Sequence, residues 1–171
     1  MPIAQTAYTD SSEAIFISPM TEHDLLEVVE IEERSGLSRW GWAAYYAELQ
    51  GNNRELMLVA RVSRPLEQTE SDEIAGYIVA RQAANELHIN NVAVRREYRR
   101  RGIGSALLRQ ILEEGRKLQA SAAFLEVRAG NALAQALYLK CGFQCVGRRP
   151  KYYSAPVEDA LIMSSELNKS A

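Results

Sequence analysis

The sequence predicts an α/β (α+β) fold in which a mixed central β-sheet of about seven strands is flanked by about four helices. Two observations predict it. Short apolar segments with strand-like composition alternate with segments whose apolar residues recur every three or four positions. Their order is strand, two helices, three strands, helix, strand, helix and two strands, which indicates a mixed sheet with helices on both faces.

The first part of the chain is predicted to hold a strand and two helices. Residues 14–18 form a short apolar strand. Thr21 is a candidate N-cap for a helix that continues to about residue 33 and ends at Ser35 and Gly36. A second helix is expected over about residues 42–49.

Three strands are predicted in succession, over residues 55–62, 74–80 and 86–94. The first is almost continuously apolar, so we expect both of its faces to be covered. The polar stretch 63–72 contains Pro65 and is expected to be an exposed hairpin loop.

A basic turn and a long helix come next. The turn holds Arg95, Arg96, Arg99, Arg100 and Arg101. Gly102 and Gly104 follow at once. One helix face then collects apolar residues at steps of three, four and seven: Ile103, Leu107, Leu108, Ile111, Leu112 and Leu118.

The last elements are a strand over residues 122–127, a helix over residues 131–140, and strands over residues 143–149 and 160–165. Gly142 is a suitable terminator for the helix, because glycine accepts the left-handed conformation.

The junction of basic turn and helix suits a diphosphate. The first N–H groups of a helix have no partner within it, and the helix dipole adds partial positive charge there. Glycines let phosphates approach the backbone closely, and arginines add forked donors. The alternatives are a solvated basic turn or a nucleic-acid patch.

Arg99-x-x-Gly102-x-Gly104 resembles the acetyl-CoA pyrophosphate loop of the GCN5-related N-acetyltransferase (GNAT) superfamily, whose pattern is Gln/Arg-x-x-Gly-x-Gly/Ala. The resemblance extends from about residue 15 to residue 167. Leu125-Glu126-Val127-Arg128 and Cys141-Gly142-Phe143 are similar to the RimI-like branch, the ribosomal-protein-alanine acetyltransferases. Where that branch carries Pro-Trp-Ser/Thr at the start of its substrate loop, this chain has Leu37-Ser38-Arg39-Trp40-Gly41-Trp42.

The resemblance implies acetyl-CoA as co-substrate, no metal, and a set of cofactor-binding residues. In the family, the pantetheine arm lies beside the strand that holds Val92, Ala93 and Val94, whose backbone would carry this role; on side-chain grounds the two valines need only be core packing. The full set is Val92, Ala93, Val94, Arg99, Arg100, Arg101, Gly102, Ile103, Gly104, Ser105 and Asn131. Asn131 can equally be a helix cap, and one amide could serve both purposes.

Glu126 is the candidate general base. It interrupts an otherwise apolar strand, where an unpaired charge is costly, and partial burial would raise its pKa toward a useful range. The alternative is an ion pair with Arg128, two residues along the same strand face. The match to the RimI-like branch favours the base.

Tyr138 is the candidate general acid. It lies seven residues after Asn131, on the same helix face. A core tyrosine with a satisfied hydroxyl is the alternative. In the family this position supplies the acid that protonates the departing thiolate.

Composition limits the other function classes. The net charge of −2 argues against direct nucleic-acid binding, and no run of apolar residues is long enough for a membrane span. Residues 1–12 lack the features of a secretion signal. Cys141 and Cys145 have poor zinc spacing, and we interpret both as reduced thiols of a cytoplasmic protein.

We therefore expect a flexible tail over residues 1–13 and a single N-acetyltransferase domain over residues 14–168. The leading hypothesis is acetylation of the N-terminal α-amine of a protein, with alanine at the terminus of a small-subunit ribosomal protein as the expected target. The enzyme alternative is a GNAT acting on a small amine or a lysine side chain. The non-enzyme alternative is an arginine-rich module that binds RNA or the ribosome.

Overall fold

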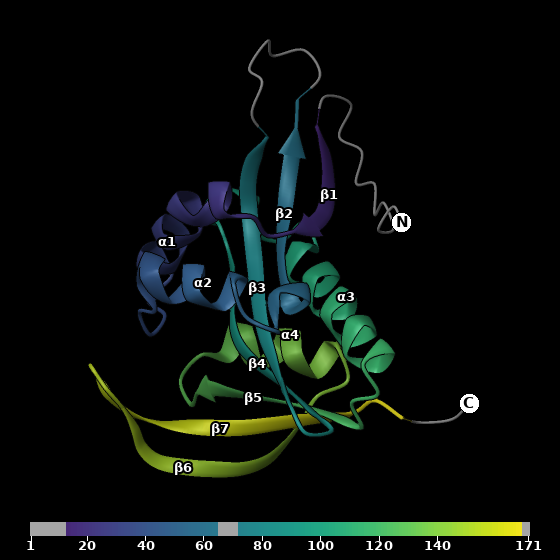
Figure 1. The fold of residues 1–171 in the computed structure, drawn as a ribbon. Helices are drawn as coiled ribbons and strands as arrows, with labels where there is room; N and C mark the ends of the chain where they lie inside the picture. Colours follow the sequence, from purple (N-terminus) through teal and green to yellow (C-terminus); the bar gives the residue numbers. More distant parts are fainter. Residues whose placement is uncertain (1–12, 65–71, 169–171) are drawn as a thin grey trace. The chain divides into compact units, whose positions relative to one another are not determined.

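The computed structural model describes residues 13–64 and 72–168, so residues 1–12 of the predicted tail and most of the predicted loop at 63–72 lie outside the described residues. Seven strands form one sheet in the order β1-β2-β3-β4-β5-β7-β6 (Figure 1). β4 and β5 pair in parallel, whereas β5–β7 and β6–β7 pair antiparallel. The mixed sheet with four α-helices confirms the predicted fold class.

The elements follow the predicted order. The strands are β1 (Ala14–Pro19), β2 (Met57–Ser63), β3 (Glu73–Ala83), β4 (Glu86–Val94), β5 (Ala122–Arg128), β6 (Gln144–Ser154) and β7 (Val157–Glu166). The helices are α1 (Leu25–Arg34), α2 (Gly41–Leu49), α3 (Ile103–Lys117) and α4 (Ala132–Lys140), with short 3-10 turns η1 (Glu22–Asp24), η2 (Arg54–Leu56) and η3 (Arg96–Tyr98).

The chain divides into two compact units, one of Met1–Val79 with Asn91–Leu107 and one of Ala80–Asn90 with Leu108–Ala171. In the first unit, β1, β2 and β3 pair antiparallel, and α1 and α2 lie against one face of β2 and β3 (Figure 1). Leucine, valine, isoleucine and tyrosine side chains fill this contact: Leu25, Val28, Ile31, Tyr45, Val59, Ile74 and Tyr77 are all buried. A single domain over residues 14–168 stays a prediction.

The entry to α1 is fixed by a capping box. The Thr21 N–H donates to Oδ2 of Asp24 at 2.8 Å. Asp24 also accepts two hydrogen bonds from the Arg61 guanidinium, at 2.8 and 2.7 Å. Thr21, the predicted N-cap, is therefore part of a real cap, and the Asp24 carboxylate also ties this turn to β2.

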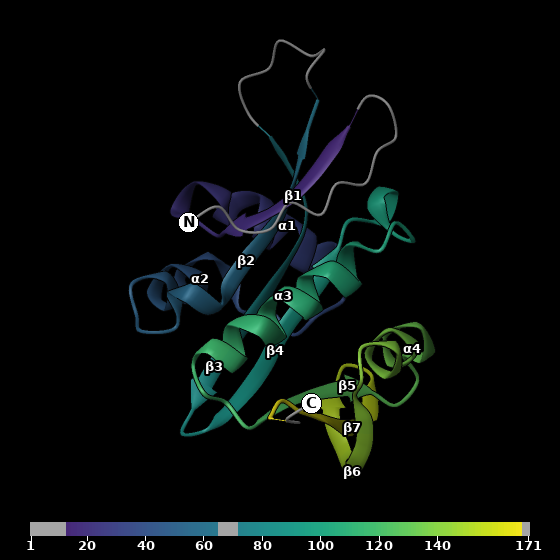
Figure 2. The same ribbon diagram turned by 90° about the vertical axis from the view of Figure 1, so that its right-hand side faces the viewer.

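In the second unit, β7 lies between β5 and β6, and α4 lies alongside β5 (Figure 2). The helix α3 packs closely at Gly115, where a Cβ would lie 2.8 Å from Cδ2 of Leu87 and 3.4 Å from Cδ1 of Leu167. Leu87, Leu108, Ile111 and Phe143 are each at most 1% exposed. These buried side chains form the apolar interior of this unit.

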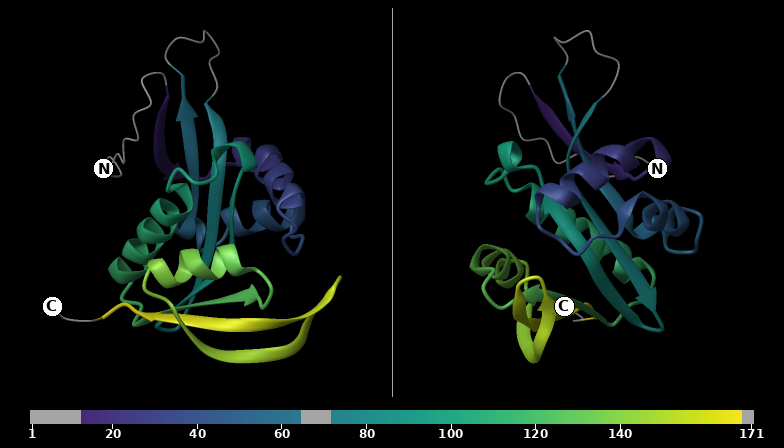
Figure 3. Two further views of the ribbon diagram at one scale, coloured as in Figure 1. Left: turned by 180° about the vertical axis from the view of Figure 1, so that it is seen from behind. Right: turned by 90° about the vertical axis from the view of Figure 1, so that its left-hand side faces the viewer.

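The bounds of several predicted strands were wrong. The strand expected over residues 55–62 begins only at Met57, because Arg54–Leu56 form a 3-10 turn. The last two strands are longer than expected and make a hairpin that pairs Tyr153 with Glu158, seen edge-on in Figure 3. The charged residues and prolines of this hairpin resemble a loop in sequence, but register shifts between Arg149 and Tyr153 let the pairing continue past them.

Candidate functional site

β4 carries Val92, Ala93 and Val94 at its C-terminal end. Ala93 is 7% exposed and belongs to the core beneath α1 and α2, whereas Val92 and Val94 are half-buried. Since side chains alternate along a strand, the two valines face away from that core. Gly76 of β3 approaches this strand end so closely that a Cβ would lie 2.7 Å from the Ala93 carbonyl oxygen.

The turn after β4 has an unusual backbone. φ is 63° at Arg100 and 77° at Gly102, both in the left-handed region. Glycine adopts this conformation freely, whereas for arginine it is strained. Strained residues of this kind are concentrated at ligand-binding and catalytic sites.

The helix α3 starts directly after this turn. The Gly102 carbonyl accepts the first helical hydrogen bond, from the Ala106 N–H at 3.0 Å. The N–H groups of Ile103, Gly104 and Ser105 therefore have no carbonyl partner within the helix. Together with the glycines, they give this turn the geometry of an anion site, and the binding of a diphosphate here stays a prediction.

The arginines of the turn differ in what they contact. Arg101 pairs with Glu13 at 3.0 Å, and the Arg99 Nε donates to the Val94 carbonyl at 3.0 Å. Arg96 and Arg100 are exposed and have no hydrogen-bond or ion-pair partner within residues 13–64 and 72–168. These two guanidinium groups are free to bind a ligand.

Glu126 lies on the more open face of β5. Ala123, Leu125 and Val127 are buried, whereas Phe124, Glu126 and Arg128 alternate with them and are half-buried. The sequence suggested a carboxylate in a wholly buried apolar strand, but only one face of β5 is buried, and Glu126 lies on the other face. The Glu126 side chain is 28% exposed, which leaves its carboxylate accessible.

The predicted alternative partner of Glu126 was wrong. Arg128 pairs instead with Glu158 at 3.3 Å and lies over the Tyr153 ring, 4.1 Å from its centroid. Arg149 of β6 contacts Glu126, with Nε 3.3 Å from Oε1.

Tyr152, also on β6, is a second neighbour of Glu126, and a hydrogen bond to Glu126 raises the pKa of the Tyr152 phenol. Sequence reasoning missed Tyr152 and Arg149 because nothing in the local pattern links them to a residue more than twenty positions earlier.

Tyr138 is buried in the second unit at 8% exposure, with its ring edge-on to Phe143. Burial raises the pKa of the phenol, and Tyr153 and Cys141 add to the effect. The hydroxyl has no hydrogen-bond partner among the described residues, and because no fully buried side-chain oxygen or nitrogen there lacks a partner, the hydroxyl keeps some access to solvent. The hydroxyl is therefore open to water or to a ligand, although the ring is buried.

Asn131 caps α4, because its side chain accepts a hydrogen bond from the Ala134 N–H at 3.1 Å. The predicted cap is confirmed. The residue is exposed, so its amide nitrogen remains accessible.

A buried carboxylate, Glu32, holds the start of α2. It is 1% exposed and accepts hydrogen bonds from the Trp40 N–H at 2.7 Å, the Gly41 N–H at 3.1 Å and the Tyr45 hydroxyl at 2.8 Å. Glu32 therefore fixes the segment in which the sequence departs from the RimI-like pattern.

Neither metal-ligand clusters nor disulfides are seen in the described part of the chain. No group of three or more histidine, cysteine or acidic side chains there could hold a metal ion. Cys141 and Cys145 are free thiols, and His88 contacts Glu86 at 2.9 Å. No helix within residues 13–64 and 72–168 is long and apolar enough to cross a membrane.

Three comparisons agree with this arrangement. The model of the acetyltransferase (GNAT) family matches residues 25–143. A ribosomal protein bS18-alanine N-acetyltransferase of Salmonella typhimurium is 32% identical over 150 residues, covering 86% of this chain and 95% of that protein. An N-alpha-acetyltransferase RimI of Mycobacterium tuberculosis is 31% identical over 161 residues, covering 91% and 94%.

Solved structures are similar as well. The crystal structure of the ribosomal-protein-S18-alanine N-acetyltransferase from Escherichia coli matches with a TM-score of 0.73 and 30% identity, covering 92% of this chain and 96% of that one. Arabidopsis thaliana NAA60 in complex with acetyl-CoA shares the fold, with a TM-score of 0.76 at 21% identity over 91% of this chain and 99% of that one.

Proposed function

This chain belongs to the acetyltransferase (GNAT) family and is an acetyl-CoA-dependent N-acetyltransferase, and we propose that it acetylates the N-terminal α-amine of a small-subunit ribosomal protein that begins with alanine. Its similarity to relatives named for that reaction, over more than four-fifths of its length, supports the acceptor.

The observation that carries the proposal is the anion site where α3 begins. Gly102 has a left-handed backbone, the first N–H groups of α3 are unused within the helix, and Arg100 has no partner among the described residues. These features fit the diphosphate of acetyl-CoA, which supplies the acetyl group as a thioester. Val92–Val94 would hold the arm of the same molecule through their backbone, and Asn131 would add an amide contact.

Glu126 is proposed as the general base. An ammonium must lose a proton before its nitrogen can attack the thioester carbonyl. The Glu126 carboxylate is partly exposed, and its partner Arg149 has a side chain that is 55% exposed. An ion pair this accessible to water is weak, so the carboxylate can exchange Arg149 for an incoming amine.

Tyr138 is proposed as the acid that serves the departing thiolate as its bond to the carbonyl carbon breaks. The raised pKa of Tyr138 keeps the phenol protonated, and its hydroxyl is not used by another described residue. Transfer from an ordinary tyrosine to a thiolate is already uphill by about 2 kcal/mol, because their pKa values are about 10 and 8.5. We therefore propose that Tyr138 acts mainly by donating a hydrogen bond to the developing charge.

The acceptor should be an α-amine rather than a lysine. The pKa of an N-terminal amine is about 8, while that of lysine is about 10.4, so a carboxylate base neutralises the former more readily. A screen of peptides with free N-termini would test this. Activity should concentrate on peptides that begin with alanine or a similarly small residue, including the ribosomal sequence.

An N-terminally blocked peptide with an internal lysine is the matched control. Comparable rates on this control would refute the α-amine assignment. Activity confined to small amines would refute a protein as the acceptor, while the chain would still be an acetyl-CoA-dependent N-acetyltransferase.

A further inference from the structure

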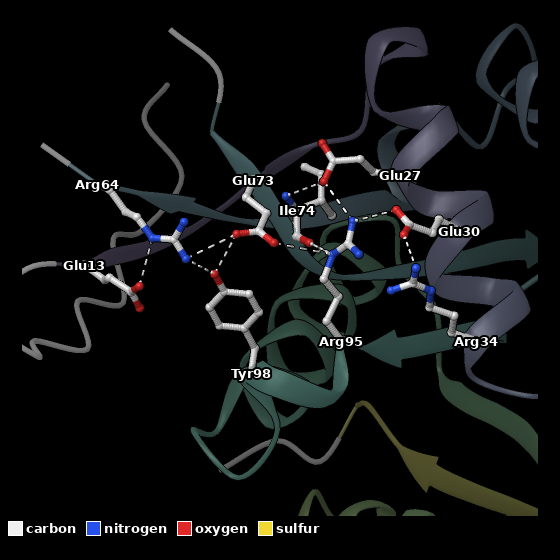
Figure 4. Close-up of polar contacts among 9 residues, drawn as sticks. All are labelled: Glu13, Glu27, Glu30, Arg34, Arg64, Glu73, Ile74, Arg95 and Tyr98. Carbon is white, nitrogen blue, oxygen red and sulfur yellow. Dashed lines mark hydrogen bonds and ion pairs between the residues drawn. The ribbon is translucent and has the colours of Figure 1, made fainter. Parts of the chain in front are cut away.

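Arg95 differs from the other arginines of the basic turn. It is the first residue after β4 and immediately precedes η3, whose last residue leads into the phosphate loop, defined as residues 99–104. Its side chain is 9% exposed, whereas that of Arg101 is 43% exposed. Figure 4 shows that its guanidinium lies between Ile74 of β3 and the glutamates of α1.

The contacts of Arg95 join three elements. Its backbone N–H donates to the Ala75 carbonyl and its Nε to the Ile74 carbonyl, both at 2.7 Å. Its Nη2 donates to Glu27 at 3.0 Å and to Glu30 at 3.3 Å, both on α1. Glu27 also accepts a hydrogen bond from the Ile74 N–H at 3.0 Å, so the same carboxylate links α1 to β3 as well as to Arg95 (Figure 4).

Tyr98 provides a second anchor, three residues closer to the loop. It is 3% exposed, and its hydroxyl donates to Glu73 at 2.7 Å and accepts from Arg64 at 2.6 Å (Figure 4). Burial and the bond to Glu73 raise the pKa of Tyr98 to about 12, so the phenol remains a donor at neutral pH. Arg101 lies over its ring, 5.1 Å from the centroid.

These contacts occupy the Arg95 guanidinium with groups of the protein. Its Nε and Nη2 are used by a carbonyl and two carboxylates, and separating this charge from its partners to bind a phosphate would be costly. The cations that remain available to a diphosphate are Arg96 and Arg100.

We propose that Arg95 and Tyr98 are positioning residues that fix the phosphate loop in its binding conformation before acetyl-CoA arrives. The inference rests on the proposed role of this loop as the diphosphate site. Both residues precede the loop in sequence, and their contacts order the loop when the protein folds. The free-energy cost of ordering the loop is then not incurred when acetyl-CoA binds. The residues raise affinity for acetyl-CoA without touching it.

The first test compares Arg95→Met with Glu27→Gln by calorimetric titration with acetyl-CoA. Arg95→Met should weaken binding about tenfold or more, since small displacements of a positioned site are worth up to about a hundredfold. Glu27→Gln should weaken binding too, because it releases Arg95. The double variant should be no weaker than Arg95→Met, because both changes break one connection.

The sign of the Glu27→Gln effect decides between the two roles of Arg95. If Arg95 acted directly on the phosphates, removing a nearby negative charge would strengthen binding or leave it unchanged. Tighter or unchanged binding by Glu27→Gln would therefore overturn the proposal. The Glu27 side chain is 37% exposed, so this variant should fold even if Arg95→Met does not.

Arg61→Met is the matched control. Arg61 also forms a forked pair with a carboxylate, Asp24, and its Nε donates to Ser18 at 2.7 Å, but it lies on β2 with no connection to the phosphate loop. It should lower the melting temperature and leave acetyl-CoA affinity unchanged. Equal loss of affinity in both arginine variants would mean general destabilisation and would also overturn the proposal.

Steady-state kinetics supply a second readout. Arg95→Met and Tyr98→Phe should raise the KM for acetyl-CoA while kcat at saturating acetyl-CoA stays close to that of the wild type. A wild-type protein that does not bind acetyl-CoA would contradict the proposed function itself. Wild-type binding with unchanged KM in both variants would contradict only the positioning role.

Discussion

At the scale of single residues, the hydroxyl of Tyr138 is the most informative group. Tyr45 is equally a buried tyrosine, yet its hydroxyl contacts Glu32 at 2.8 Å, Tyr77 at 2.9 Å and Asn91 at 2.7 Å. The Tyr138 hydroxyl has no such partner among the described residues. The hydrogen bonds of the Tyr45 hydroxyl give it a structural role. The Tyr138 hydroxyl has no such bond, in keeping with its proposed role as a donor to the departing thiolate.

Tyr138→Phe removes only this oxygen and should separate the two roles. We expect turnover to fall by about a hundredfold or more, the usual span for one acid or donor. The melting temperature should barely change, because no hydrogen bond to another described residue is lost. Tyr45→Phe is the control and should lose about 1–3 kcal/mol of stability. Near-normal turnover of Tyr138→Phe would contradict the proposed role of the hydroxyl and show that Tyr138 serves only to pack the core.

Glu126→Gln tests the proposed base. The change keeps size and removes the basic group, so turnover should fall by roughly a hundredfold to ten-thousandfold. Affinity for acetyl-CoA should be kept, and raising the pH should restore part of the rate because more of the amine is then neutral. An earlier melting transition with normal specific activity would show that the pair with Arg149 is the only task of Glu126.

At the scale of elements, the close approach of β3 to the end of β4 constrains the strand proposed to hold the cofactor arm. A Cβ on Gly76 would lie 2.7 Å from the Ala93 carbonyl and 3.2 Å from the Val94 Cα, and neither backbone atom can turn aside. Only glycine at position 76 lets β3 approach β4 this closely, since there is no space for a methyl group between the two strands.

Gly76→Ala should cost about 1–3 kcal/mol of stability, as overpacking does. It should also raise the KM for acetyl-CoA, because the strand end that shifts is Val92–Val94. Gly51→Ala is the control: the new Cβ would be 3.4 Å from the Glu48 carbonyl, an ordinary contact. Chemical denaturation measures the stability of both variants, and steady-state kinetics measure their KM for acetyl-CoA. If the two variants had equal stability and equal KM, Gly76 would not constrain the end of β4.

At the scale of the whole molecule, buried phenols set the alkaline limit of stability. Burial raises the pKa of Tyr45, Tyr77 and Tyr138, which are 0%, 0% and 8% exposed. In the unfolded chain these phenols ionise near pH 10, while in the folded protein they keep their protons. The unfolded state therefore loses protons first, and stability is complete below about pH 10 and falls as the pH rises further.

Urea unfolding between about pH 8 and pH 11 should show this loss, at up to about 1.4 kcal/mol per pH unit for each phenol. Tyr138→Phe should reduce the slope by one phenol without lowering stability at pH 8. A free energy of unfolding that stays constant above pH 10 would contradict the burial of these groups.

The sequence by itself determined the features that depend on neighbouring residues. Apolar spacing at 3.6 residues per turn located α3, and a cap of α4 was one of the two roles that the sequence offered for Asn131. The turn of arginines and glycines predicted an anion site, which stays a prediction. These features are governed by backbone geometry within one or two turns of chain, so a local pattern is sufficient to predict them.

Only the tertiary structure decided which charged and polar groups meet. Arg95 reaches Glu27 across 68 positions of sequence, and Glu126 pairs with Arg149 of another strand rather than with its neighbour Arg128. The five arginines of the turn are alike in sequence, yet the Arg95 side chain is only 9% exposed whereas Arg100 is exposed. Partners are chosen by sheet register and helix packing, and these depend on the summed burial of the whole core rather than on the residues nearby.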